Sequence, residues 1–221
     1  DLVEPWPTPT PEMRAKGEAY LAKLRECVAS IDSDEIERTA SIPDEVFTAL
    51  GDAGALGMKI PEAYGGQGLS YYYYCKALML VGSVNGSVAT LLSAHQSIGV
   101  PQPVRMFGNE EQKQRFLPRV AGHEVSAFLL TEPDVGSDPA RLGTTATPTD
   151  GGYLLNGVKL WGTNGTVATL LVVMARVPAS EGRKGGITAF VVEADSPGIT
   201  VENRNAFLGL RGIENSVTRF H

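Results

Sequence analysis

Two short segments of the sequence carry polar residues that could hold a ligand. In residues 126–138, SAFLLTEPDVGSD, an apolar run stops at a turn that offers the hydroxyl groups of Thr131 and Ser137. Gly136 has no side chain, so the backbone N–H groups of this turn could approach a ligand closely. Small residues and exposed amides at the end of a strand form a concavity that favours anions. This turn could therefore hold an anionic group.

The second segment, residues 152–165, reads GYLLNGVKLWGTNG and ends near an aromatic and a hydroxyl. Trp161 offers a flat apolar face, and Thr163 offers another hydrogen-bond donor. A flat ligand with ring carbonyls, ring nitrogens and a phosphate would suit both segments, and a flavin dinucleotide is such a ligand. The same residue types are also common in ordinary β-turns, and Trp161 would then be a core residue. The residues by themselves leave both interpretations open.

Several other kinds of site are excluded by spacing. No Walker loop is present, and GGQGLS at residues 65–70 follows no strand pattern and lacks the dinucleotide fingerprint. The three histidines, His95, His123 and His221, are too scattered to predict a metal site. Ser137 lies in VGSDP and not in the G-x-S-x-G turn of serine hydrolases. We therefore predict neither a metal centre nor a hydrolase nucleophile.

The composition narrows the class of protein further. The 221 residues are 43% hydrophobic, which is enough for one large domain or two modest ones. The net charge of −6 without a Lys/Arg cluster argues against nucleic acid as a partner. No apolar window reaches the roughly 18 residues of a membrane span, and no secretory signal is visible. The two isolated cysteines, Cys27 and Cys75, predict reduced thiols and a cytoplasmic protein, or a mitochondrial matrix protein in a eukaryote.

The first half of the chain has the periodicity of helices. Apolar residues recur at spacings of three, four and seven. Ser70 is a candidate N-cap, and Asn109 with Gln112 resembles a capping box. The pattern predicts helices over residues 12–30, from Pro43, from Ser70 to about Gly82, over 87–98, and from Asn109 to Val120.

After Gly122 the period changes to that of strands. Short segments rich in Val, Thr and aromatic residues are separated by Gly, Pro or Asp turns. We therefore predict an α+β fold with an all-α domain over residues 1–122 and an antiparallel β-barrel or sandwich over residues 123–221. No helix of more than two turns is expected between residues 140 and 205.

Two groups of residues in the helical half could have a role in a site. Tyr71–Tyr74 are four successive aromatics, of which at most two can share one helix face. We expect them to pack in the core, with the lining of a ligand pocket as the alternative. His95 and Gln96 are expected to be buried polar groups with hydrogen-bond partners.

Several stretches in the same order give the chain a resemblance to the acyl-CoA dehydrogenase family over essentially its whole length. They are IPEAYGGQG, FGNEEQKQRFLPRVAG, FLLTEPDVGSD, YLLNGVKLWGTNG, GGITAFVVE and FLGLRGIENS. AHQSIG at residues 94–99 is closer to the long- and very-long-chain branch. The resemblance implies a helical domain, a middle β domain and a C-terminal helical domain. We expect this chain to lack the third domain and the end of the second.

The resemblance also implies a site for FAD. The expected cofactor-binding residues are Phe128, Leu130, Thr131, Gly136, Ser137, Trp161, Gly162 and Thr163.

Their implied roles differ. The main chain near Leu130 and the hydroxyl of Thr131 would bond the pyrimidine side of the flavin. Ser137 would serve both the cofactor and an acyl-CoA substrate. Trp161 would pack on the ring, and Thr163 would donate towards N5, the atom that accepts hydride.

This sequence departs from the family pattern at two places. Gly162 stands where many members have a bulky β-branched residue, and we expect it to loosen the strand without moving its neighbours. Asp134 and Val135 stand where small residues are common.

The implied reaction is the α,β-dehydrogenation of fatty acyl-CoA to trans-2-enoyl-CoA, a step of β-oxidation. In the family, the carboxylate that removes the α-proton lies in the C-terminal domain, so we expect no catalytic residue in this chain and no activity from it alone. Glu132 is expected to hold the turn. The implied partners are electron-transfer flavoprotein or a similar acceptor, and further copies of the chain in a homodimer or homotetramer.

Two alternatives keep the fold but change the function. One is an acyl-CoA oxidase or flavin monooxygenase, in which the reduced flavin reacts with oxygen. The other is a non-catalytic paralogue that binds acyl-CoA or acts as a scaffold.

Overall fold

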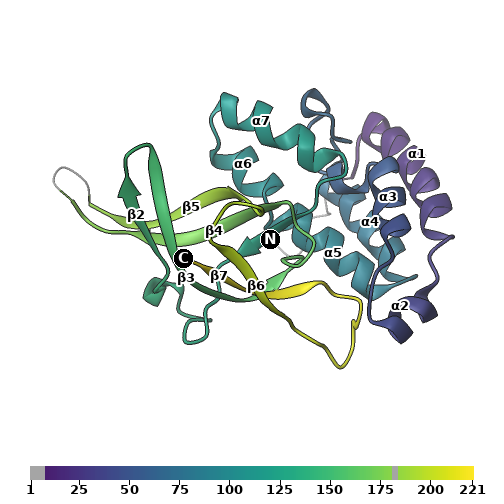
Figure 1. Cartoon of the computed structure of the whole chain (residues 1–221). Helices are drawn as coiled ribbons and strands as arrows, with labels where there is room; N and C mark the ends of the chain where they lie inside the picture. The colour runs from purple at the N-terminus through teal and green to yellow at the C-terminus, as the bar shows by residue number, and fades with distance from the viewer. Residues whose placement is uncertain (1–7, 181–183) are drawn as a thin grey trace, which may run out of the picture.

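The computed structural model describes residues 8–180 and 184–221, so residues 1–7 of the predicted helical domain lie outside it. The chain runs through helices first and strands second (Figure 1). The helices are α1 (Pro11–Val28), α2 (Ser33–Thr39), α3 (Asp44–Asp52), α4 (Tyr71–Gly82), α5 (Gly86–Ser97), α6 (Pro101–Phe107) and α7 (Glu110–Ala121). The strands are β1 (Ser126–Leu129), β2 (Thr145–Thr149), β3 (Gly152–Thr163), β4 (Leu170–Val177), β5 (Gly186–Glu193), β6 (Ile199–Arg204) and β7 (Asn215–Phe220).

The switch from helix to strand falls between Ala121 and Ser126, which is where the period of the sequence changes. Three short 3₁₀ turns complete the described elements: η1 (Ala55–Gly57), η2 (Glu62–Tyr64) and η3 (Pro139–Arg141). In the described part of residues 140–205 no longer helix occurs, as predicted. No helix of the described part is long and apolar enough to span a membrane.

Of the two helix caps predicted from the sequence, one forms as predicted and one does not, and the structure adds a further cap at Asn85. The Asn109 side chain accepts from Gln112 N–H at 2.8 Å, and the Gln112 side chain accepts from Asn109 N–H at 2.9 Å, so the predicted capping box is confirmed. Asn85 caps α5 through Val88 N–H. Ser70 precedes α4 as predicted, but its hydroxyl makes no capping bond and is buried without a partner among the described residues.

The strands form one curled sheet of mixed direction. Its order is β1-β4-β2-β3-β7-β6, and β5 pairs with the opposite edge of β4 along the whole of that strand. Most pairs are antiparallel, as predicted, but β1 runs parallel to β4, and β2 meets β4 in a parallel register at one position. Parallel neighbours require a crossover connection, and here β2 and β3 supply it. Periodicity reports which face of a strand is buried and contains no information about its direction.

Strand β4 is the centre of the β half and is buried on both faces. Leu170 and Val172 pack against α6 and α7, whereas Leu171 and Val173 face the other side of the sheet. Figure 1 shows α6 and α7 lying over the end of the sheet nearest the helical half. A strand buried on both faces reads as an uninterrupted apolar run, which explains the sequence LLVV at this position.

His95 ties the helical half to the β half. Its Nε2 donates to the carbonyl groups of Leu56 and Val120 at 3.1 and 3.0 Å, and its Nδ1 accepts from Ser126 N–H at 2.9 Å. Burial lowers the pKa of His95 to about 4, so the ring is neutral at physiological pH. The expectation of a satisfied core histidine is confirmed.

The other two expectations in the helical half are met in part. Gln96 accepts from Lys59 N–H, but its Nε2 is buried with no partner among the described residues, contrary to the prediction. Of the four tyrosines, Tyr73 and Tyr74 are buried and Tyr71 and Tyr72 are exposed. The helix therefore places two of the four rings in the core, as its geometry requires.

Candidate cofactor site

The two segments singled out by the sequence lie side by side. Leu160 N–H donates to the carbonyl of Thr131 at 2.8 Å. The Nζ of Lys159 donates to the carbonyl of Leu130 at 3.1 Å and to the Glu132 carboxylate at 2.8 Å. The turn that follows β1 is thus attached to the last residues of β3, and the hydroxyls of both segments can serve one ligand.

Glu132 holds the turn from within. Its carboxylate accepts from the N–H groups of Gly143 and Thr144, at 2.7 and 2.9 Å, in addition to Lys159. Its own N–H and C=O pair with Val135, which closes the turn. Burial by itself would raise the pKa of Glu132, but these hydrogen bonds outweigh it and lower the pKa to about 2. Glu132 is therefore a fixed carboxylate, and the expectation that it holds the turn is confirmed.

Lys159 is the partner that the sequence did not identify. Its side chain is 0% exposed, and burial lowers the pKa of the ammonium group while Glu132 partly offsets that effect. A buried cation requires an anionic partner. Here the partner, Glu132, lies 27 residues away in the chain, so no local sequence pattern predicts the pair.

Trp161 has an unusual backbone conformation. Its φ is +59°, in the left-handed region, and the register between β3 and β7 shifts between Lys159 and Gly162. Non-glycine residues pay a cost of about 1–2 kcal/mol there, and such strain is concentrated at functional sites. The ring is 53% exposed and meets the Phe207 ring edge-on, with centroids 6.1 Å apart. The alternative in which Trp161 is a core residue is therefore wrong.

Gly162 is required by packing. A Cβ at this buried position would lie 2.4 Å from Leu129 Cδ2 and 3.0 Å from the Ser216 hydroxyl. The space beside this glycine is filled by the side chains of Leu129 and Ser216. Its neighbours pack closely around it, and the register between β3 and β7 shifts between Lys159 and Gly162, so the loosening effect of this glycine stays a prediction.

Replacing Gly162 by Val should lower the free energy of unfolding by about 1–3 kcal/mol, because overpacking a filled site forces its neighbours to move. Urea denaturation of the two proteins would measure the difference. The control is Gly162→Val combined with Leu129→Ala, in which the removed side chain makes room and part of the loss is recovered. Equal stability of the wild type and Gly162→Val would show that Leu129 moves aside freely.

The remaining predicted residues lie around these two segments. Thr131 and Thr163 are half-buried; among the described residues the Thr131 hydroxyl has no hydrogen-bond partner, and the Thr163 oxygen accepts only from Asn215 Nδ2. Ser137 is exposed, and a Cβ at Gly136 would meet open space.

Phe128 is placed differently from the other predicted residues. Its side chain packs with the cluster beneath α6 and α7, on the face of β1 opposite Leu129, which meets Gly162. Leu130, at the end of β1, is joined to Lys159 through its carbonyl.

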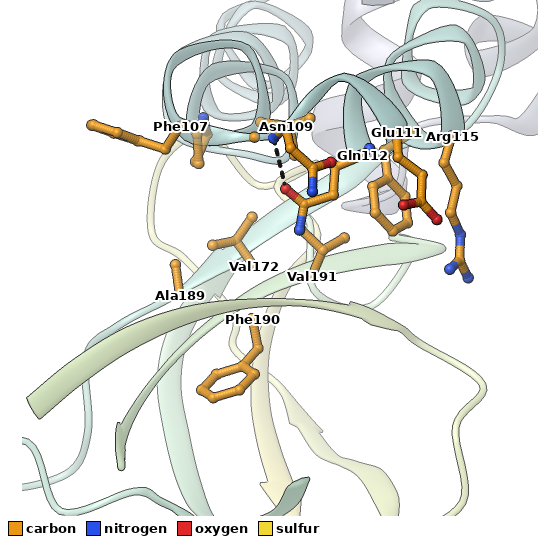
Figure 2. A pocket seen from close by; sticks show the side chains of 13 residues that line it. Phe107, Asn109, Glu111, Gln112, Arg115, Val172, Ala189, Phe190 and Val191 are labelled. Atoms are coloured by element: carbon orange, nitrogen blue, oxygen red, sulfur yellow. Dashed lines mark hydrogen bonds between the residues drawn. The ribbon is translucent and has the colours of Figure 1, made fainter. Parts of the chain in front are cut away.

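A separate groove of about 670 Å³ lies between helices α6–α7 and strands β4–β5. Figure 2 shows Phe107 and Arg115 towards its two ends, with Val172, Ala189 and Val191 along the strands. The Phe107 side chain is 82% exposed. None of the predicted site residues lines this groove, so it is distinct from the candidate site.

The donor set of the candidate site fits a flavin. Hydroxyl groups of Thr131 and Thr163 have no acceptor among the described residues, and the turn at Gly136 is open for an anionic chain. The Trp161 ring offers an apolar face beside them. A helical half joined to a curled sheet of mixed direction defines a two-part α+β protein.

Two family models together match most of the chain. Residues 17–124 match the N-terminal domain of acyl-CoA dehydrogenases, and residues 127–221 match the middle domain. The chain belongs to the acyl-CoA dehydrogenase family.

Its similarity to individual members is high. The chain is 61% identical over 222 aligned residues to a Mycobacterium tuberculosis protein named probable acyl-CoA dehydrogenase FadE10, and the match covers 100% of this chain and 34% of that protein. The chain thus spans about a third of the length of this relative.

Solved structures of dehydrogenases acting on CoA thioesters have the same fold as this chain. Butyryl-CoA dehydrogenase of Megasphaera elsdenii is 28% identical, with a TM-score of 0.86 over 98% of this chain and 57% of its own. Glutaryl-CoA dehydrogenase of Mycobacterium smegmatis, in complex with FADH2, is 30% identical, with a TM-score of 0.82 over 96% of this chain and 53% of its own. The complex with reduced FAD confirms the predicted cofactor, FAD, at the level of the family.

Proposed function

We propose that this chain supplies part of the flavin-ring site of an enzyme that dehydrogenates fatty acyl-CoA thioesters at the α,β position. The observation that carries the proposal is the attachment of the Thr131 turn to the end of β3. It brings two hydroxyl groups without acceptors and a strained, exposed Trp161 to one place. The Mycobacterium tuberculosis relative is named a probable acyl-CoA dehydrogenase, and the two solved structures are named butyryl-CoA and glutaryl-CoA dehydrogenase, which supports the same reaction class.

Each residue has a role that its environment permits. Bound FAD supplies the hydride-accepting atom N5. Thr163, whose hydroxyl proton has no acceptor among the described residues, donates towards that atom. The Leu130 main chain and the Thr131 hydroxyl would bond the pyrimidine side of the cofactor, and Trp161 would pack on its ring. Ser137, exposed on the turn, serves both the cofactor and the acyl-CoA.

The proton at the α-carbon needs a base, and Glu132 is unsuited to that task. Its carboxylate already accepts from two backbone N–H groups and Lys159, and its pKa of about 2 makes it a weak base. An efficient general base has a pKa near the working pH. We infer that another part of the protein, outside these 221 residues, provides the carboxylate, as the resemblance implies.

We also propose the partners and the location of the protein. The substrate is a fatty acyl-CoA, and the electron acceptor is an electron-transfer flavoprotein. The protein forms a homodimer or homotetramer and is cytoplasmic. Oxygen consumption on addition of acyl-CoA would instead indicate the oxidase alternative.

Thr163→Val is expected to weaken FAD binding about fivefold, because one hydrogen bond is worth about 0.5–1.5 kcal/mol net, and to slow flavin reduction by acyl-CoA. Valine keeps the shape and removes the donor. FAD affinity is measured by flavin fluorescence, and reduction by stopped-flow bleaching. Thr166→Val is a matched control, since the Thr166 hydroxyl donates to Glu214 and not to the site. Unchanged affinity and reduction rate in Thr163→Val would mean that the motif is only a turn.

A further inference from the structure

Asn215 lies directly opposite Thr163. It is the first residue of β7, and the antiparallel register of β3 and β7 pairs the two residues. Its side chain is almost fully buried, with 2% of the residue exposed, and its Nδ2 lies 3.3 Å from Thr163 Oγ1. A buried amide beside a site residue has few alternatives to the partner it faces.

The amide of Asn215 belongs to a relay of three asparagines. Asn215 Oδ1 accepts from Asn205 Nδ2 at 2.8 Å, and Asn205 Oδ1 accepts from Asn203 Nδ2 at 3.1 Å. A backbone bond from Asn205 N–H to the Asn215 carbonyl, at 2.9 Å, holds the two segments together. The relay has a polarity, because each amide nitrogen points towards Thr163 and each amide oxygen points away from it.

This polarity determines what the Thr163 hydroxyl can do. A hydroxyl has one proton to donate and two lone pairs. Because the Thr163 oxygen accepts from Asn215, its proton is not used between them, and the described residues offer it no other acceptor. The proton is thus free to point at a ligand. Had Asn215 presented its oxygen, Thr163 would donate to Asn215 and would meet the ligand only as an acceptor.

We propose that Asn215 is a positioning residue that keeps the Thr163 hydroxyl a donor towards flavin N5. The proposal rests on the proposed function, in which Thr163 faces that atom. Asn215, on β7, sets the direction of the hydrogen bond to Thr163, and Asn205 and Asn203 in turn orient the Asn215 amide.

The test uses the holoprotein loaded with FAD that carries ¹⁵N at N5, because the resonance of this nitrogen reports hydrogen bonds donated to it. Thr163→Val defines the resonance without a donor. Asn215→Leu, which removes the ordering partner, should move the resonance part of the way to that value. Asn215→Asp, which can only accept, should draw the Thr163 proton to itself and move the resonance nearly the whole way. Val217→Ala, two residues along the same strand, should leave it unchanged.

The affinity for FAD gives a second readout. Thr163→Val and Asn215→Asp should each weaken binding about fivefold. The double variant should be no weaker than the weaker single variant, because residues that act through one bond are not additive.

The possible results separate the two proposals. If Thr163→Val leaves the resonance and the affinity unchanged, the proposed function fails. If Thr163→Val moves the resonance and neither Asn215 variant does, the positioning role of Asn215 is wrong while the proposed function stands. If Asn215→Asp retains the wild-type resonance, the relay runs in the opposite sense and the inference is overturned.

Discussion

Replacing Lys159 by Met is expected to lower the free energy of unfolding by about 3–5 kcal/mol, because it leaves the buried Glu132 carboxylate without its cation. The side chain of Lys159 is fully buried, and that of Glu132 is nearly so. The variant also frees the Leu130 carbonyl from β3, so FAD affinity should fall with the stability. Urea denaturation and flavin fluorescence measure the two effects.

The control is the double variant Lys159→Met with Glu132→Leu. Replacing both members of a buried ion pair by apolar residues of similar size is often neutral, but Glu132→Leu also removes the acceptor of the Gly143 and Thr144 N–H groups, so this variant should recover only part of the stability. It should recover less of the FAD affinity, since the Lys159 bond to the Leu130 carbonyl stays absent. A single variant as stable as the wild type would show that the pair is not needed to balance the buried charge.

Acid should destabilise the wild type more than this double variant. The pKa of Glu132 is about 2 in the folded protein and about 4.3 in an unfolded chain. A carboxyl group with a lowered folded pKa stabilises the protein above its unfolded pKa, and that stabilisation is lost as the pH falls through the folded value. The loss should amount to about 3 kcal/mol between pH 5 and pH 2.

The comparison removes the contribution of other carboxyl groups, because they are common to both proteins. The free energy of unfolding would be measured by urea at half-unit steps between pH 5 and pH 2. The free energy of unfolding of the wild type minus that of the double variant should fall by about 3 kcal/mol from pH 5 to pH 2. Parallel curves would contradict the lowered pKa of Glu132.

Local chemistry was predictable from the sequence. The capping box of Asn109 and Gln112 needs two residues three positions apart, and it forms as predicted. The change of period near Gly122 marks the change from helix to strand because each element buries residues at its own spacing. The turn at Thr131 and its strand were also identified, and Glu132 holds that turn.

Long-range pairing was not predictable. No sequence pattern indicates that Lys159 meets Glu132 or that Asn215 meets Thr163, because these contacts depend on which strands become neighbours. The parallel pairing of β1 with β4 has the same cause. The left-handed conformation of Trp161 accompanies the register shift between β3 and β7. The pattern of residue types along the chain does not predict this conformation. Side-chain packing of Leu129 likewise explains Gly162 only once the fold is known.

A crystal structure of the FAD-loaded protein tests the central claim most directly. The isoalloxazine ring should lie against Trp161, with Thr163 Oγ1 within hydrogen-bond distance of N5 and Asn215 Nδ2 still on the Thr163 oxygen. The Thr131 hydroxyl should bond the opposite, pyrimidine side of the ring. A ring found elsewhere, for example in the groove between Phe107 and Arg115, would contradict this placement of the cofactor.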